Sequence, residues 1–162
     1  MRRCMLVFAA RPHGAYPFRG GKKEGTMQVS EIMTTRIVSV EPTATVREAA
    51  TLMSRNNIGS VPVVDGGAVR GMLTDRDIVL RCVSENKDAD TVKVSDICTH
   101  GAVSVRPQDP VSNAMHLMSA EQVRRLPVVD NGKLVGMLSF ADVAREKTGM
   151  EVAQSISEIS MP

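Results

Sequence analysis

The sequence predicts an α/β (α+β) fold made of two copies of one β-α-β-β-α unit. Two observations lead to this prediction. Residues 29–78 align with residues 94–143 without a gap, and over two-fifths of the aligned positions are identical. Within each copy, apolar residues recur first at the spacing of strands and then at that of helices. Two copies are too few for a solenoid, which needs at least about three repeats for a core, so we expect a pseudo-symmetric pair.

Each copy begins with a short β-rich run and a helix. Residues 37–40 form the run in the first copy. Thr45 and Glu48 have the spacing of a capping box, which predicts that the helix begins there. In the second copy an Asp-Pro pair opens the helix, and we expect Pro110 at the first helical position.

Two short apolar runs joined by a tight turn come next in each copy. The turn is Asp65-Gly66-Gly67 in the first copy and Asn131-Gly132 in the second. These residues favour the two-residue turns of β-hairpins. A second helix is expected to start after Thr74 and to run to about Val83.

Charge and composition separate the N-terminal segment from the rest. The net charge is +2, yet residues 1–26 hold six basic residues against one acidic residue, and the remainder holds 14 basic and 17 acidic residues. The folded part therefore offers little support for a nucleic-acid-binding surface. We interpret residues 1–26 as a disordered extension, or as the result of a start codon placed too far upstream, with Met27 as the natural first residue. A secretory signal is a third interpretation, but the apolar run at residues 4–10 is short for one.

The domain boundaries follow from the repeat. Residues 27–84 form the first copy, 85–93 a connector and 94–146 the second copy. Residues 147–162 are predicted to form a helix with one narrow apolar face. That face either packs on its own domain or lies at a subunit interface.

Several classes of chemistry find no support. The three cysteines, Cys4, Cys82 and Cys98, lack CxxC spacing, so we expect reduced thiols in a cytoplasmic protein, with no disulfide and no metal site. No apolar run reaches the roughly 18 residues of a membrane span. The histidines are scattered and the glycine-rich stretches do not spell a P-loop. We therefore expect a protein without catalytic residues.

The stretch 71–77 returns almost unchanged as 136–142, and it has two readings. Thr74 and Asp77 have capping-box spacing, with Asp in place of Glu. Alternatively, the two oxygens of an ionised Asp77 are suited to accept hydrogen bonds from paired hydroxyls of a ligand, and Thr74 and Arg76 are suited to an anion such as phosphate. The threonine is able to serve both purposes.

The repeated unit, its Pro-Val-Val-Asp-x-Gly hairpin and its Gly-hydrophobic-hydrophobic-Thr/Ser-x-x-Asp junction resemble the CBS (cystathionine-β-synthase) domain. Two in tandem resemble a CBS pair, or Bateman module, over roughly residues 28–146. The resemblance implies two repeats packed sheet to sheet with pseudo-two-fold symmetry, and two clefts for adenine nucleotides. It implies a regulatory module that binds AMP, ADP or ATP, or an adenosine-containing ligand such as NAD. It also implies a disc-like homodimer that signals to a downstream protein partner. The alternative is an interaction or nucleic-acid-binding protein that uses the basic N-terminal segment.

The resemblance also assigns residues to each cleft, joining the Thr/Ser-x-x-Asp of one copy to segments of the other. Cleft A takes Thr74, Arg76, Asp77, Thr99, Ala102, Val103, Val123, Arg124, Arg125, Leu126 and Pro127. Cleft B takes Thr34, Ile37, Val38, Ile58, Gly59, Ser60, Val61, Pro62, Ser139 and Asp142.

On this assignment the two clefts differ in charge. Cleft A has three arginines for phosphate, whereas cleft B has Ala141, Gly59 and Ser60 at the matching places. Charge-assisted hydrogen bonds contribute about 1.5–3 kcal/mol each. We therefore expect cleft A to bind nucleotide more tightly than cleft B.

Overall fold

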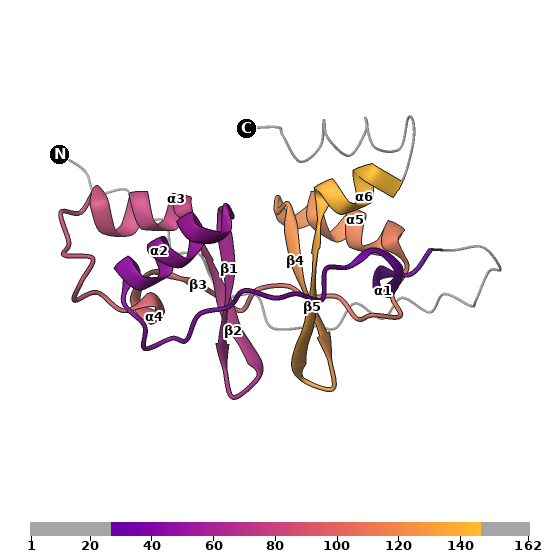
Figure 1. Ribbon diagram of the computed structural model, residues 1–162. Helices are drawn as coiled ribbons and strands as arrows, with labels where there is room; N and C mark the ends of the chain where they lie inside the picture. The colour runs from indigo at the N-terminus through magenta and orange to yellow at the C-terminus, as the bar shows by residue number, and fades with distance from the viewer. Residues whose placement is uncertain (1–26, 147–162) are drawn as a thin grey trace.

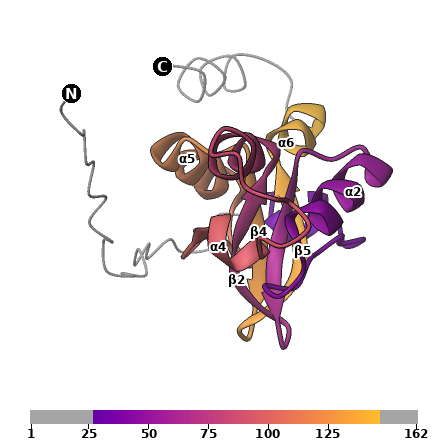
Figure 2. The same ribbon diagram turned by 90° about the vertical axis from the view of Figure 1, so that its left-hand side faces the viewer.

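The computed structural model describes residues 27–146 (Figures 1 and 2). The predictions for residues 1–26 and 147–162 lie outside these described residues. The first copy contains α1 (Val29–Ile32), α2 (Val46–Asn56), β1 (Ser60–Asp65), β2 (Ala68–Thr74), α3 (Asp75–Ile78) and the π-helical turn η1 (Val79–Val83). The second contains α4 (Val94–Ile97), β3 (Thr99–His100), α5 (Val111–Glu121), β4 (Arg125–Asp130), β5 (Lys133–Ser139) and α6 (Phe140–Glu146).

The equivalent helices α2 and α5 begin differently. In α2, Thr45 Oγ1 accepts the Glu48 N–H at 3.2 Å, and the Glu48 carboxylate accepts the Thr45 N–H at 2.7 Å, which confirms the predicted capping box. In α5 the prediction was one residue off. Pro110 is the N-cap, with extended backbone and no side-chain hydrogen bond, and the helix starts at Val111.

The predicted hairpins are confirmed. β1 pairs with β2 and β4 with β5, both antiparallel. The turn residues Gly66, Gly67, Asn131 and Gly132 all have positive φ, which explains the glycine and asparagine at these positions. The expected strand at residues 37–40 is only a single parallel bridge, because Val40 alone of this run exchanges hydrogen bonds with β1.

The hydrophobic core consists of two clusters, and each copy gives its first segment to the other. The cluster beneath α2 and the β1–β2 hairpin also buries Val94, Ile97 and Cys98 of the second copy. The cluster beneath α5 and the β4–β5 hairpin buries Val29 of the first copy. Packing units therefore differ from sequence repeats, because each core is completed by a segment from the neighbouring copy.

The two hairpins lie side by side at the centre, and the helices of each unit lie outside them (Figure 1). The Leu134 N–H donates to the Gly67 carbonyl at 3.0 Å across this boundary. The arrangement agrees with the expected packing of sheet against sheet. Within the part of the chain that the structure describes, no helix is long and apolar enough to cross a membrane.

Candidate functional site

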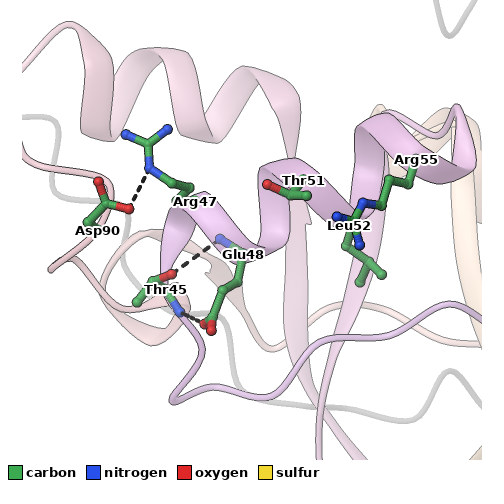
Figure 3. Close-up of a pocket in the computed structure, with 7 residues that line it drawn as sticks. All are labelled: Thr45, Arg47, Glu48, Thr51, Leu52, Arg55 and Asp90. Atoms are coloured by element: carbon green, nitrogen blue, oxygen red, sulfur yellow. Dashed lines mark hydrogen bonds and ion pairs between the residues drawn. The ribbon is translucent and has the colours of Figure 1, made fainter.

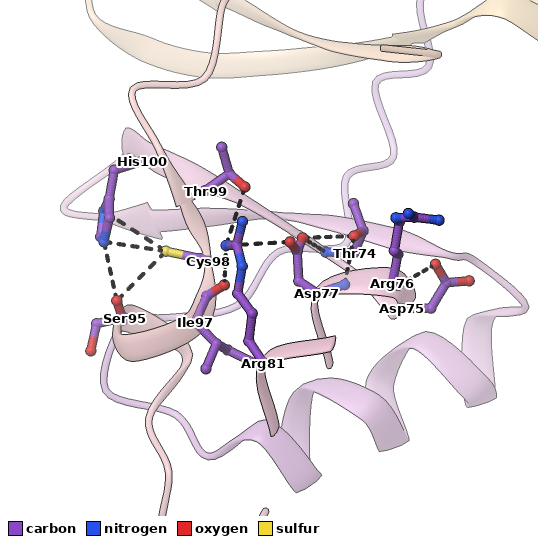
Figure 4. Close-up of polar contacts among 10 residues, drawn as sticks. All are labelled: Thr74, Asp75, Arg76, Asp77, Arg81, Ser95, Ile97, Cys98, Thr99 and His100. Carbon is purple, nitrogen blue, oxygen red and sulfur yellow. Dashed lines mark hydrogen bonds and ion pairs between the residues drawn. The ribbon is translucent and has the colours of Figure 1, made fainter. Parts of the chain in front are cut away.

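The first junction, where β2 runs into α3, is held by a closed set of hydrogen bonds (Figure 4). Oδ2 of Asp77 accepts from the Thr74 N–H at 2.9 Å and from the Thr74 hydroxyl at 2.6 Å. The Thr74 hydroxyl in turn accepts the Asp77 N–H at 3.1 Å. The capping-box reading is therefore confirmed. It fixes one oxygen of a carboxylate whose side chain is only 13% exposed and leaves the other oxygen facing outward from the cap.

That second oxygen faces Arg81, which the sequence analysis missed. Nη1 of Arg81 lies 3.3 Å from Oδ1 of Asp77 and donates to the Ile97 carbonyl at 2.7 Å. It also lies 3.5 Å from the Thr99 hydroxyl. One guanidinium nitrogen thus joins the first junction to the first segment of the second copy. The acid-to-arginine spacing of four residues along a helix was the available signal.

The second junction, between β5 and α6, repeats the cap. Oδ2 of Asp142 accepts from the Ser139 N–H at 2.8 Å and from the Ser139 hydroxyl at 2.5 Å. Arg145 forms an ion pair with the other oxygen, Oδ1. The Asp142 side chain is 10% exposed. Both junctions therefore present a largely buried carboxylate with one oxygen in the cap and one beside an arginine.

Each junction adjoins the first segment of the other copy, as predicted. β3 pairs with β2, and this places Thr99 opposite Met72. Thr34 and Met137 exchange backbone hydrogen bonds of 2.8 and 2.9 Å beside the second junction. Thr99 is thus placed near Asp77, and Thr34 lies near Asp142.

Backbone pairing places each segment before a proline beside the junction of its own copy, whereas the resemblance assigned each segment to the cleft of the other copy. Strand pairing sets Ser60 opposite Thr74 and Arg125 opposite Ser139, so each segment lies with the junction of its own copy. Backbone hydrogen bonds agree, because Asp75 donates to the Gly59 carbonyl and Phe140 to the Arg124 carbonyl. By backbone pairing the first junction adjoins Ile58, Gly59, Ser60, Val61 and Pro62, and the second junction adjoins Val123, Arg124, Arg125, Leu126 and Pro127. Arg125 still reaches the first copy through a 3.3 Å hydrogen bond from Nη1 to the Ser60 hydroxyl.

This placement changes the charge comparison. The backbone of Arg124 and Arg125 adjoins the second junction, although Nη1 of Arg125 reaches Ser60 of the first copy. Arg145 is a cation of the second junction itself. The first junction has Arg76, which is exposed, and Arg81. The expectation that cleft B lacks a local cation is therefore wrong.

The remaining predicted residues lie in the segments that connect the two units. Val38 packs against the first core and Val103 against the second. Ile37 and Ala102 are half-buried. Near Thr99, the exposed His100 has Nε2 3.1 Å from the Ser95 carbonyl and covers the Cys98 thiol. Burial raises the pKa of that thiol, so Cys98 is protonated at neutral pH.

A shallow depression lies elsewhere, on the outer side of α2 (Figure 3). Its volume is about 560 Å³. It is lined by Thr45, Arg47, Glu48, Thr51, Leu52, Arg55 and Asp90. Arg47 forms an ion pair with Asp90, and Thr45 is bonded to Glu48. Because these polar groups already satisfy one another, the depression is a weaker candidate than the two junctions.

The fold and the two junctions define a class of protein with two CBS repeats. A family model for the CBS domain matches residues 29–84 and 94–149. The chain belongs to the CBS domain family.

Known relatives have the same layout. The chain is 42% identical to the CBS domain-containing protein YhcV of Bacillus subtilis over 127 residues, which cover 78% of this chain and 90% of YhcV. It resembles the crystal structure of Hypoxic Response Protein I with two coordinated zinc ions (TM-score 0.70, 30% identity), covering 75% of this chain and all of that one. Among residues 27–146, no group of three His, Cys, Asp or Glu side chains is placed to hold a metal ion.

A second similar structure carries ligands. It is the CBS domain pair of protein MJ0100 in complex with 5′-methylthioadenosine and S-adenosyl-L-methionine (TM-score 0.68, 25% identity). The match covers 75% of this chain and 95% of that one. Two tandem CBS repeats therefore define this chain as a CBS-pair regulatory module.

Proposed function

We propose that this chain binds an adenine nucleotide, or another adenosine-containing ligand, at the two junctions and transmits occupancy to a protein partner through a change in conformation. The observation that carries the proposal is the pair of equivalent carboxylates, Asp77 and Asp142. Each is held by a cap through one oxygen only, and each lies beside the first segment of the other copy.

The chemistry suits a ribose. An ionised carboxylate has about four lone-pair sites, and the cap occupies those of Oδ2. Oδ1 remains able to accept hydrogen bonds from ribose hydroxyls. Burial makes such bonds stronger than they would be in water, because the local dielectric constant is low.

The arginines suit the rest of a nucleotide. Arg76 and Arg81 lie at the first junction, Arg124 and Arg145 lie at the second, and Arg125 extends from the second copy to Ser60 of the first. Guanidinium groups bind phosphate in a fork of two parallel hydrogen bonds. Since both junctions have arginines, the structure offers no reason to rank the first above the second. AMP, ADP and ATP are the first ligands to test, and NAD is the main alternative. The ligands of the MJ0100 pair support adenosine as the shared part.

Calorimetry with AMP, ADP, ATP and NAD tests the proposal. Asp77→Asn and Asp142→Asn retain the shape of the cap but remove the charge. We expect each variant to lose one binding event and the double variant to lose both, with circular dichroism confirming the fold. A double variant that is folded and binds AMP, ATP and NAD as tightly as the unmodified chain would show that the junctions are not the site.

We further propose that the module acts as a homodimer. The π-helical turn η1 exposes Val79, Leu80 and Val83, which are 53%, 49% and 64% accessible. Adjacent exposed apolar side chains favour a protein interface. Analytical ultracentrifugation of Val83→Glu should then show a shift toward monomer, whereas an unchanged mass would place the interface elsewhere.

A further inference from the structure

Arg81 differs from the other arginines of the junctions in how it is held. Its three contacts all use one nitrogen, Nη1, which reaches Asp77, the Ile97 carbonyl and the Thr99 hydroxyl. A guanidinium has five N–H donors, and Nε and Nη2 carry three of them. Within residues 27–146 the structure records no partner for Nε or Nη2. The Arg81 side chain as a whole is 45% exposed, so a ligand in solution has access to the residue.

The contacts of Nη1 fix the direction of the unused edge. The Ile97 carbonyl and Asp77 hold the guanidinium from two different copies of the repeat, and this limits its rotation. An arginine fixed in this way has already lost much of its side-chain freedom, so a ligand that binds it incurs less entropic cost. The edge formed by Nε and Nη2 has the geometry that matches two oxygens of a phosphate.

We propose that Arg81 makes the first junction selective for a phosphorylated adenosine. Nη1 remains on Asp77, Ile97 and Thr99, while Nε and Nη2 bind the phosphate. A nucleoside gains only the ribose contact with Asp77, whereas a nucleotide gains both contacts. This inference rests on the proposed function, because it needs an adenosine ligand at Asp77.

In the first junction the arginine beside the carboxylate also contacts the other copy, which is not recorded for its counterpart in the second junction. A phosphate on Arg81 is bound to a residue that holds the backbone of Ile97. In the second junction, Arg145 forms its ion pair with Asp142, and no other contact of Arg145 is recorded within residues 27–146. Occupancy of the first junction by a nucleotide therefore tightens the link between the copies.

The test compares AMP with adenosine by calorimetry in an Asp142→Asn background, so that only the first junction reports. We expect Arg81→Gln to weaken AMP about tenfold and to change adenosine less than about twofold, since a net charge-assisted hydrogen bond corresponds to roughly a factor of ten. Arg81→Lys retains the charge but cannot form the fork of two hydrogen bonds. Its AMP affinity should lie between those of the unmodified chain and of Arg81→Gln. Arg70→Gln removes an equal charge from the exposed Arg70–Asp65 pair on the hairpin, and it should leave the ratio of AMP to adenosine affinity unchanged.

The outcomes separate this inference from the proposed function. If Arg81→Gln weakens AMP and adenosine equally, Arg81 is a structural clamp and the inference is overturned. If Arg81→Gln fails to fold, the lysine variant decides, because an unchanged ratio of AMP to adenosine affinity in it would also overturn the inference. If the Asp142→Asn protein binds neither ligand, the nucleotide function of the first junction fails and the selectivity fails with it.

Discussion

The two junctions have the same cap but different surroundings. Thr74 with Asp77 and Ser139 with Asp142 make the same three hydrogen bonds, and their lengths agree within about 0.1 Å. The arginines differ in number and in what they contact. Arg81 connects the two copies, whereas the structure records Arg145 only with the carboxylate of its own copy.

The difference shows which part of the unit is fixed by folding. The cap ends a strand and starts a helix, so its loss affects both elements. The arginines lie on exposed positions, where a substitution costs little stability. Two sites with one backbone geometry can therefore acquire different ligand preferences, and the following experiments test how far the equivalence extends.

The largest expected effect concerns the cores. Leu73 and Leu138 are fully buried at equivalent positions, and Leu→Ala at such sites costs about 3 kcal/mol. We expect similar losses from Leu73→Ala and Leu138→Ala in urea unfolding. Because each core contains a segment of the other copy, each variant should still unfold in one transition. Two separated transitions would show that the cores are independent.

The next largest effect should distinguish the two units. A Cβ at Gly71 would lie 2.4 Å from the Thr99 carbonyl oxygen, whereas at Gly136 it would lie 2.7 Å from the Met33 sulfur. The methionine side chain can move aside and the backbone of β3 cannot. We expect Gly71→Ala to cost about 2–3 kcal/mol and Gly136→Ala about 1 kcal/mol or less in urea unfolding. Equal losses would contradict the steric explanation.

Removing the hydroxyls of the caps should have a smaller and equal effect. Thr74→Ala and Ser139→Ala each remove an N-cap side chain, at a cost of about 1 kcal/mol. Thermal unfolding of both variants would measure this, and Thr74→Ser serves as a control that retains the hydroxyl. A clearly larger loss for one of the two would show that its cap does more than start a helix.

The smallest effect concerns α2, which begins with a capping box, whereas α5 has no side-chain hydrogen bond at its N-cap. The backbone hydrogen bond from Thr45 lowers the pKa of Glu48. A lowered pKa in the folded state stabilises the fold above the pKa of the unfolded chain, and this contribution disappears as the pH falls through the folded value. The loss of stability in Glu48→Ala should therefore be present at neutral pH and shrink below the usual pKa range of glutamate. Denaturant titrations at several pH values would measure it, and a loss independent of pH would contradict it.

The parts of this structure that depend on local sequence were predictable. The Thr45–Glu48 box, the Gly66-Gly67 turn and the Thr74–Asp77 cap each involve residues within three positions of one another. The family resemblance added the placement of Thr99 and Thr34 beside the opposite copy's junction.

The rest depends on register and on distant contacts. Strand pairing sets the backbone of Arg125 opposite Ser139, while its side chain reaches Ser60 of the first copy, and a list of motifs contains neither fact. The contact of Arg81 with the Ile97 carbonyl crosses 16 positions and a connector. The burial of residues 94–98 in the first core has no local signal either, because an apolar residue does not specify which core it enters.

The exchange of first segments has a consequence for the ancestry of the chain. A single ancestral repeat would have had to obtain its missing segment from a second molecule, and it would have been stable only as an obligate dimer. Joining two such partners in one polypeptide removes the requirement that they be identical. Positions 76 and 141, or 59 and 124, are then free to differ in charge, as they do in this chain.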